Sequence, residues 1–248
     1  MLKPAIRALL KRSGLRLLRS NAIPFGFDWC IDIKHLCGVP SADAEVTTCF
    51  DVGANLGQTA SRLVQAFPTA NVYSFEPVPA TFQLMKRNTD RMQRVQTFNI
   101  GMSDTTGQCE MLIADASGRS RVGSGVNNNG VLVQLDTLDH FCRQHSIGTL
   151  NVLKIDVEGH ELPVLRGAEI LLRNGNIHYL VCECDFVARE DEPHGQFSEI
   201  VTFLQPFGFR IVSFYTGGVD SQGWRWGDVL FALPGSIMNR SVSCSPLQ

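Results

Sequence analysis

Short apolar runs alternate with stretches of helical periodicity along the chain from residue 46 onward. Such runs are typical of buried strands, whereas apolar residues three or four positions apart indicate helices. The pattern predicts strands at 46–51, 71–76, 95–102, 108–114, 151–156, 177–183, 209–215 and 228–233, an apolar run at 131–135, and helices at 58–67, 80–91, 137–145, 162–173 and 196–206. This alternation predicts an α/β domain with a mostly parallel sheet and helices on both faces.

The pattern predicts one main domain rather than an array of repeats. The 248 residues suffice for one large hydrophobic core. We expect a helical extension over 1–45, the α/β domain over 46–240 and a tail over 241–248. A run rich in Gly, Ser and Asn at 117–130 predicts a mobile loop within the domain.

Residues 1–20 concentrate positive charge, with six basic side chains and no acidic one. Their apolar residues fall near helical spacing, so one interpretation is a basic amphipathic helix in peripheral contact with an anionic membrane. The other interpretation is a helix that lies across the domain. The apolar stretch at 8–10 is far too short for a secretory signal, and we therefore expect a cytoplasmic location.

Composition excludes several classes of protein. A net charge of −2 with 44% hydrophobic residues argues against a mainly disordered chain. No apolar run approaches the length that spans a membrane. The near balance of 22 basic and 24 acidic residues argues against a nucleic-acid partner. The 8 cysteines show neither a Cys-x-x-Cys pair nor a zinc spacing, so buried, reduced thiols are expected.

Four acidic residues, Asp51, Glu76, Asp156 and Glu183, lie at the ends of predicted strands. The carboxyl ends of parallel strands meet at one edge of a sheet, and ligands bind beyond that edge where the strand order reverses. We therefore expect these four carboxylates to line one binding site.

A turn containing two glycines joins the first of these strands to the helix that follows, over residues 51–57. Gly53 allows a sharp turn and the close approach of a ligand, and Asn55 belongs to the few residue types that tolerate a left-handed backbone. Gly57 allows close packing at the start of the helix, whose free amides favour a carboxylate or hydroxyl group. Glu76 follows about 20 residues later in the sequence, a spacing typical of a carboxylate that binds both hydroxyls of a ribose.

The turn favours S-adenosylmethionine over a dinucleotide. A pyrophosphate group needs amides without negative charge nearby, yet Asp51 lies at the mouth of the turn and no Lys or Arg lies between residues 51 and 61. The glycine spacing also differs from the Gly-x-Gly-x-x-Gly fingerprint. An acid in this place suits the ammonium group of S-adenosylmethionine. The alternatives are a nicotinamide-dependent oxidoreductase and a non-catalytic cofactor-binding protein.

Four segments resemble the FkbM-type methyltransferases, a family of class I S-adenosylmethionine-dependent enzymes with a Rossmann-like fold. The segments read FDVGANLGQ at 50–58, SFEP at 74–77, QLDTLD at 134–139, and LKIDVEGHE at 153–161 continuing in VLRGA at 164–168. The resemblance covers about 46–185. It implies a seven-stranded, mostly parallel sheet with an antiparallel last strand, and O-methylation as the reaction.

The resemblance also implies roles for individual residues. The turn at 51–57 would hold the methionine end of the cofactor, Glu76 its ribose, and the residues beyond the third strand its adenine. The implied cofactor-binding residues are Asp51, Gly53, Ala54, Asn55, Gly57, Glu76, Pro77, Ser103, Asp104 and Asp156.

Methyl transfer to a hydroxyl needs a group that takes the hydroxyl proton during the attack. Asp156, Glu158 and His160 lie at the exit of the strand at 151–156, and they are the catalytic candidates. Asp156 would orient the acceptor and His160, whose ordinary pKa lies near neutral pH, would accept the proton. The alternative is that Glu158 or Glu161 caps the following helix and His160 is a surface residue.

A metal site is the less supported interpretation of these acids. Asp156, Glu158 and Glu183 could offer three oxygens to Mg²⁺, but they lack a convincing fixed spacing, so we expect transfer without a metal. The loop at 185–195 and a turn at 224–226 are expected over the active-site edge, where aromatic rings could stack on a sugar. The alternative is that the loop is merely solvated and that the turn is a hydrophobic anchor of a hairpin. The expected partner is a small-molecule or glycan acceptor, with its hydroxyl on a saccharide, glycolipid or secondary metabolite, and no motif predicts an oligomeric state.

Overall fold

The computed structural model describes residues 23–37, 46–113, 120–122, 130–187, 196–221 and 223–236. The helices are α2 (Trp29–Leu36), α3 (Gln58–Ala66), α4 (Pro79–Thr89), α5 (Leu138–Gln144), α6 (Glu161–Arg166), α7 (Glu169–Arg173) and α8 (Phe197–Leu204), with short 3₁₀ turns at Gln205–Phe207 and Pro234–Ser236. The strands are β1 (Thr48–Val52), β2 (Asn71–Phe75), β3 (Val95–Phe98), β4 (Gly101–Met102), β5 (Gly107–Ile113), β6 (Ser120–Val122), β7 (Gly130–Asp136), β8 (Leu150–Ile155), β9 (Ile177–Asp185), β10 (Arg210–Asp220) and β11 (Gly223–Ala232).

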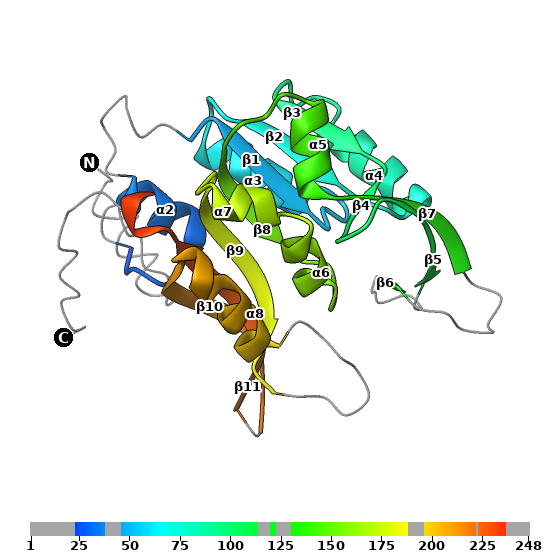
Figure 1. The fold of residues 1–248 in the computed structure, drawn as a ribbon. Helices are drawn as coiled ribbons and strands as arrows, with labels where there is room; N and C mark the ends of the chain where they lie inside the picture. Colours follow the sequence, from blue (N-terminus) through cyan, green and yellow to red (C-terminus); the bar gives the residue numbers. More distant parts are fainter. Residues whose placement is uncertain are drawn as a thin grey trace, which may run out of the picture.

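The main sheet has seven strands in the order β10-β11-β9-β8-β1-β2-β3 (Figure 1). Strands β9, β8, β1, β2 and β3 are parallel, and β11 is antiparallel to both of its neighbours. The predicted seven-stranded sheet with an antiparallel last strand is therefore confirmed. The chain leaves β1 toward β2 on one side and continues from β8 toward β9 on the other, so the strand order reverses between β1 and β8.

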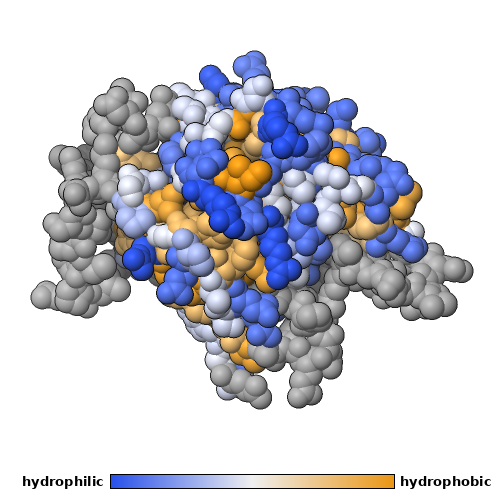
Figure 2. Space-filling model, in the orientation of Figure 1, coloured by the Kyte–Doolittle hydropathy of each residue, from blue (hydrophilic) through white to orange (hydrophobic). Residues whose placement is uncertain are grey.

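Helices cover both faces of this sheet, as the alternating pattern predicts. One apolar cluster joins α5, α6, α7 and α8 to the sheet, and a second joins α2 and α3 to the opposite face. The helices pack through one side and leave the other to water. Figure 2 accordingly shows a largely hydrophilic surface over the first of these helical layers, with apolar side chains gathered near α7 and α8.

Two predicted elements are divided in the structure. The strand expected at 95–102 ends at Phe98 and resumes as β4, which pairs with β7 in a second sheet. Asn99 fixes the break, because its amide donates to the carbonyls of Glu76 and Pro77. The helix expected at 162–173 is interrupted at Gly167, where a Cβ atom would lie 1.9 Å from the carbonyl oxygen of Ser103.

The prediction of a loop at 117–130 is partly wrong, because this range contains β6. Strands β4, β7, β5 and β6 form the second sheet, which Figure 1 shows beside the main sheet. The residues 114–119 and 123–129 lie outside the described part of the chain. Pairing of β6 with β5 supplies the backbone hydrogen bonds that a Gly- and Ser-rich composition does not reveal.

The predicted turn at 224–226 is also wrong, because Trp224 and Trp226 lie within β11. The last two strands are longer than expected and continue past their apolar part as a two-stranded hairpin (Figure 1). A hydrophobic pattern detects only the buried part of such strands. Residues 188–195, the main part of the predicted active-site loop, lie outside the described residues.

Part of the predicted N-terminal extension packs on the sheet. Helix α2 begins after Asp28, whose carboxylate accepts hydrogen bonds from the amides of Cys30 and Ile31. Its side chains Trp29, Cys30, Ile33 and Leu36 belong to the second apolar cluster. Residues 1–20, with the predicted basic helix, and the tail at 241–248 lie outside the described residues. In the described part of the chain no helix has the length and apolar character needed to cross a membrane.

Candidate functional site

A pocket of about 310 Å³ lies at the carboxyl ends of β1, β2, β8 and β9, where the strand order reverses. Ligands of parallel sheets bind at this point, and the volume falls within the range of ligand pockets. Of the residues singled out from the sequence, the wall contains Gly53, Ala54, Asn55, Glu76, Pro77, Asp156, Glu158, His160 and Glu183. It also contains residues from the segments that resemble the family, namely Val52, Gln58, Phe75, Leu135 and Val157. The sequence did not indicate the remaining ones, which are Thr59, Thr81, Gly101, Met102 and Met111.

The turn between β1 and α3 has the left-handed backbone that its sequence predicts. Gly53, Asn55 and Gly57 have φ angles of 82°, 48° and 87°. A Cβ atom on Gly53 would lie 1.7 Å from the carbonyl oxygen of Asp156, so only glycine allows the turn to pass this close to the end of β8. Helix α3 starts after Gly57, which has no side chain to cap it. The Ala60 amide in its first turn acts on the buried carboxylate of Asp51, whereas Gln58 and Thr59 line the pocket and offer their amides to a ligand.

Glu76 ties the turn to the end of β2. Its Oε2 accepts a hydrogen bond from the Asn55 amide at 3.1 Å, and its Oε1 accepts one from the Val78 amide at 2.9 Å. Burial raises the pKa of this carboxyl group, and the two amides act in the opposite direction. Each oxygen keeps a further lone pair, so the carboxylate can still accept hydrogen bonds from two hydroxyl groups of a ligand.

Asp51 is buried beneath the turn and is not among the residues that line the pocket. Its Oδ2 has no hydrogen-bond partner within the described residues. Burial raises the pKa of Asp51 to about 7, and the nearby positive charge of Lys154 opposes this rise. The predicted contact of Asp51 with the ammonium group of the cofactor stays a prediction.

Ser103 and His160, which the sequence assigned to different ends of the cofactor, are in contact. The Nε2 atom of His160 lies 2.9 Å from Ser103 Oγ, and Ser103 Oγ lies 3.3 Å from Asp104 Oδ1. Burial lowers the pKa of His160, and Asp104 partly opposes this effect. His160 is half-buried in the pocket wall, directly before α6. Its predicted role as proton acceptor stays a prediction.

The segment between β8 and α6 folds as a tight turn around Glu161. The Oε1 atom of Glu161 accepts hydrogen bonds from the amides of Val157 and Gly159, both at 3.1 Å. Glu158 and Gly159 have positive φ angles of 51° and 102°. Glu161 therefore closes the turn before α6, which is close to the capping role that the sequence left open for it. The turn places Glu158 and His160 in the pocket wall.

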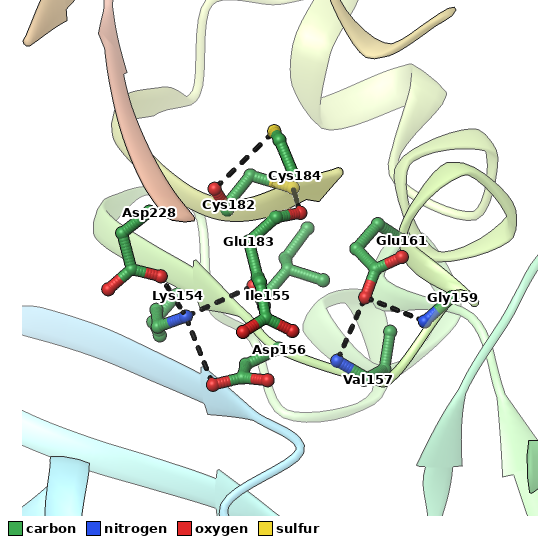
Figure 3. A network of polar contacts seen from close by, with 10 residues as sticks. All are labelled: Lys154, Ile155, Asp156, Val157, Gly159, Glu161, Cys182, Glu183, Cys184 and Asp228. Atoms are coloured by element: carbon green, nitrogen blue, oxygen red, sulfur yellow. Dashed lines mark hydrogen bonds and ion pairs between the residues drawn. The ribbon is translucent and has the colours of Figure 1, made fainter. Parts of the chain in front are cut away.

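Lys154 is the functional candidate that sequence reasoning missed. It is only 3% exposed within β8, and its Nζ lies 2.9 Å from Asp228 Oδ1 and 3.3 Å from Asp156 Oδ2 (Figure 3). These two carboxylates raise the pKa of the ammonium group against the opposing effect of burial. A lysine inside an apolar strand was the available signal, because a buried lysine requires a partner of opposite charge.

Glu183 faces Asp156 at the end of the neighbouring strand (Figure 3). Burial and the negative charge of Asp156 raise the pKa of Glu183 to about 9, and Lys154 opposes this rise. Within the described residues no group of three His, Cys, Asp or Glu side chains could hold a metal ion. The expectation of metal-independent transfer stays a prediction.

Comparison with known proteins identifies the family. Residues 51–211 match the family model described as the methyltransferase FkbM domain. The chain belongs to this family. The match contains the whole glycine turn, Glu76 and the turn before α6. This domain is therefore a methyltransferase domain, and its cofactor is S-adenosylmethionine.

Two relatives and one solved structure illustrate the similarity. The hexuronic acid methyltransferase AglP of Haloferax volcanii is 32% identical over 130 residues, which are 51% of this chain and 52% of AglP. The 2-O-methyltransferase NoeI of Sinorhizobium fredii is 25% identical over 146 residues, covering 52% of this chain and 60% of NoeI. The matched stretch thus spans only about half of the first relative. The METTL16 methyltransferase domain has the same fold, with a TM-score of 0.50 at 10% identity over 81% of this chain and 64% of that one.

Proposed function

We propose that this protein transfers the methyl group of S-adenosylmethionine to a hydroxyl oxygen of a saccharide. The observation that carries the proposal is a single pocket whose wall joins the glycine turn and Glu76 on one side to Asp156 and Glu183 on the other. The first group suits the cofactor, and the second offers carboxylates where the hydroxyl of an acceptor would need them.

The residues of the pocket fit the chemical groups of the cofactor. The uncapped amides at the start of α3 suit the methionine carboxylate. The remaining lone pairs of Glu76 suit the two ribose hydroxyls. The apolar side chains of Met102 and Leu135 line the wall on the side of the second sheet, and they suit the adenine ring. Ser103 and Asp104, which we expected near the adenine, follow Met102 but are not among the residues that line the wall. In this orientation the sulfonium group comes to lie near Asp156.

The choice of a saccharide rests on two arguments. AglP is named for a hexuronic acid and NoeI for a 2-O position. The carboxylates of Asp156 and Glu183, at the ends of β8 and β9, can accept hydrogen bonds from hydroxyl groups. A sugar presents several hydroxyl groups on neighbouring carbons, so one hydroxyl can be held in place while the next one reacts.

The proposal is tested by incubating the purified protein with methyl-labelled S-adenosylmethionine and a panel of glycosides. The panel contains neutral hexosides, 6-deoxyhexosides and hexuronosides, and mass spectrometry locates any added methyl group. We expect one class to gain a single methyl group on oxygen. Cofactor binding without transfer to any glycoside would refute the saccharide acceptor, and binding of NADH instead of S-adenosylmethionine would favour an oxidoreductase.

A further inference from the structure

A row of charged side chains crosses one face of the main sheet. Directly paired residues share a face, and so do residues two positions apart on one strand. Asp51 pairs with Lys154 across β1 and β8, and Glu183 pairs with Asp228 across β9 and β11. Lys154 also pairs with Val181, two residues before Glu183. All four charged residues therefore lie on the face that α2 and α3 cover.

The ammonium group of Lys154 has no proton left for Glu183. It donates to Asp228 at 2.9 Å, to Asp156 at 3.3 Å and to the carbonyl oxygen of Ile155 at 3.3 Å, which uses its three protons. Among the described residues no donor forms a hydrogen bond with the Glu183 carboxylate. Figure 3 shows this carboxylate directed toward Asp156, without a hydrogen bond. Glu183 thus keeps its lone pairs for a ligand.

The four other titratable side chains in the wall already have partners, Glu158 among them. Asp156 is paired with Lys154, and His160 lies within hydrogen-bond distance of Ser103. Both oxygens of Glu76 accept backbone amides. These partners compete with an acceptor hydroxyl for the same atoms.

Glu183 lies on the acceptor side of the pocket. The strand order β9-β8-β1-β2 separates Glu183 from Glu76 by three strand spacings, or about 14 Å. With the ribose at Glu76, the methyl group comes to lie between these two residues, near the end of β8. A hydroxyl that attacks the methyl group from the side opposite the sulfur would then approach from the end of β9.

We propose that Glu183 is the general base of the transfer and that Lys154 is a positioning residue that holds Asp156 and Asp228 beside it. This inference rests on the proposed function and gives Glu183 the role expected of His160. As the acceptor oxygen bonds to the methyl carbon, the bond from that carbon to sulfur breaks and the sulfur keeps the electron pair. The hydroxyl proton passes to a carboxylate oxygen of Glu183 and is later released to water.

The charges around Glu183 link its protonation to the cofactor. The charged groups that face it come from β8, the turn before α6, α6 and β11, namely Lys154, Asp156, Glu158, Glu161 and Asp228. Its raised pKa, about 9, keeps the carboxyl protonated at neutral pH until a positive charge enters the pocket and favours the ionised form. Binding of S-adenosylmethionine should therefore release a proton, and binding of S-adenosylhomocysteine, whose sulfur is neutral, should release less.

The first experiment measures this proton release without any acceptor. Calorimetry of S-adenosylmethionine and S-adenosylhomocysteine binding at pH 7.5, in two buffers of different ionisation enthalpy, gives the number of protons released. We expect the parent protein and Glu199→Gln, which changes an exposed acid on α8, to release a proton with S-adenosylmethionine. Glu183→Gln should release no proton with either ligand, because it keeps the shape of the side chain and removes its ionisation. It should bind S-adenosylhomocysteine within about 3-fold of the parent and S-adenosylmethionine about 10-fold more weakly, because ionisation of Glu183 contributes to the second affinity.

The second experiment measures transfer to the glycoside that the panel identifies. Glu183→Gln should lower kcat by about 10²–10⁴-fold, the usual effect of losing a general base, while the KM for S-adenosylmethionine rises by no more than about 10-fold. In the parent, kcat should fall as the pH drops below the pKa of Glu183 in the complex, and this acid limb should be absent in Glu183→Gln. Glu183→Asp, which keeps a carboxylate one methylene shorter, should retain the acid limb at reduced kcat. His160→Ala should also keep the acid limb, whatever its kcat.

Several outcomes would overturn the inference. These are a kcat of Glu183→Gln within a few-fold of the parent, proton release that persists in this variant, or loss of the acid limb in His160→Ala instead. If the parent methylates no glycoside, the proposed acceptor fails, and the proton-release comparison alone decides the role of Glu183. If the parent does not bind S-adenosylmethionine, both proposals fail.

Discussion

The two sides of the pocket are assembled in different ways. The glycine turn and Glu76 come from one continuous β1-α3-β2 unit, and the hydrogen bond that joins them spans 21 residues. The other side, here called the acidic side, consists of Asp156, Glu183 and Asp228 with Lys154, and it is assembled from β8, β9 and β11. Its central ion pair joins Lys154 to Asp228, which lie 74 residues apart in the sequence. The first side depends on backbone conformation, whereas the second depends on buried charges that must be paired. Substitutions on the two sides should therefore fail in different ways.

Loss of the buried lysine should have the largest effect, and it should act on folding. Lys154→Met removes the shared partner of Asp156 and Asp228 and leaves their charges uncompensated at a partly buried position. Breaking a buried ion pair in this way typically costs about 3–5 kcal/mol. The free energy of unfolding from urea titration should fall by this amount. Lys86→Met on the exposed side of α4 removes the same charge and should change it by less than about 0.5 kcal/mol.

A smaller loss in the Lys154 variant would contradict the assignment of this residue as the centre of the acidic side. An unfolding free energy within about 1 kcal/mol of the parent would mean that the two carboxylates are well solvated without the lysine.

A methyl group on the glycine turn should act on ligand binding. Gly53→Ala places a Cβ atom 1.7 Å from a backbone oxygen at a φ of +82°, so the turn or the end of β8 must move. We expect the affinity for S-adenosylhomocysteine, measured by calorimetry, to fall by at least about 100-fold, or 2.7 kcal/mol. Gly148→Ala, where nothing lies within 4 Å of the added atom, is the matched control. Unchanged affinity in Gly53→Ala would show that the ligand does not depend on this turn.

Removal of the ribose carboxylate should have a somewhat smaller effect on the same side. Glu76→Ala loses charge-assisted hydrogen bonds worth roughly 1.5–3 kcal/mol, or about 10- to 150-fold in affinity for S-adenosylhomocysteine. Part of this loss comes through the Asn55 amide, which Glu76 also holds. Thermal unfolding of the same variant separates the two causes, and an affinity equal to that of the parent would remove Glu76 from the ribose site.

Removal of divalent metal should have the smallest effect, because none is expected. The ammonium group of Lys154 already places a positive charge beside Asp156 and Asp228, which opposes binding of a second cation there. Exhaustive treatment with EDTA should leave the rate of transfer unchanged. A loss that Mg²⁺ restores would mean that Asp156, Glu158 and Glu183 bind a metal.

The sequence predicted the first side of the pocket far better than the second. Positive φ angles at Gly53 and Asn55 follow from residue type, and the place of Glu76 follows from the spacing of one strand-helix-strand unit. The pairing of Glu183 with Asp228 depends on the antiparallel register of β9 and β11, which no local pattern encodes. For the same reason the contact between Ser103 and His160 was not foreseen.

The fold shows the same division between local and distant information. Alternating periodicity was enough to predict the main sheet, because the apolar residues of each strand and helix follow the spacing typical of that element. The break between α6 and α7 was missed because it depends on contacts from other elements, at Gly167 with Ser103 and through Asp139, which accepts the amides of Ile170 and Leu171.

Helix α2 has a consequence for dissecting this protein. The stretch that matches the family begins at residue 51, so a truncated protein starting near residue 46 would be a natural choice. Such a truncation would remove one of the two helices that cover the sheet face carrying Lys154, and it would remove Asp32, whose carboxylate accepts a 2.6 Å hydrogen bond from Tyr215 on β10. The apolar side chains beneath α2 would then be exposed to water, so reduced activity of the truncated chain would reflect the loss of this helix rather than a property of the pocket.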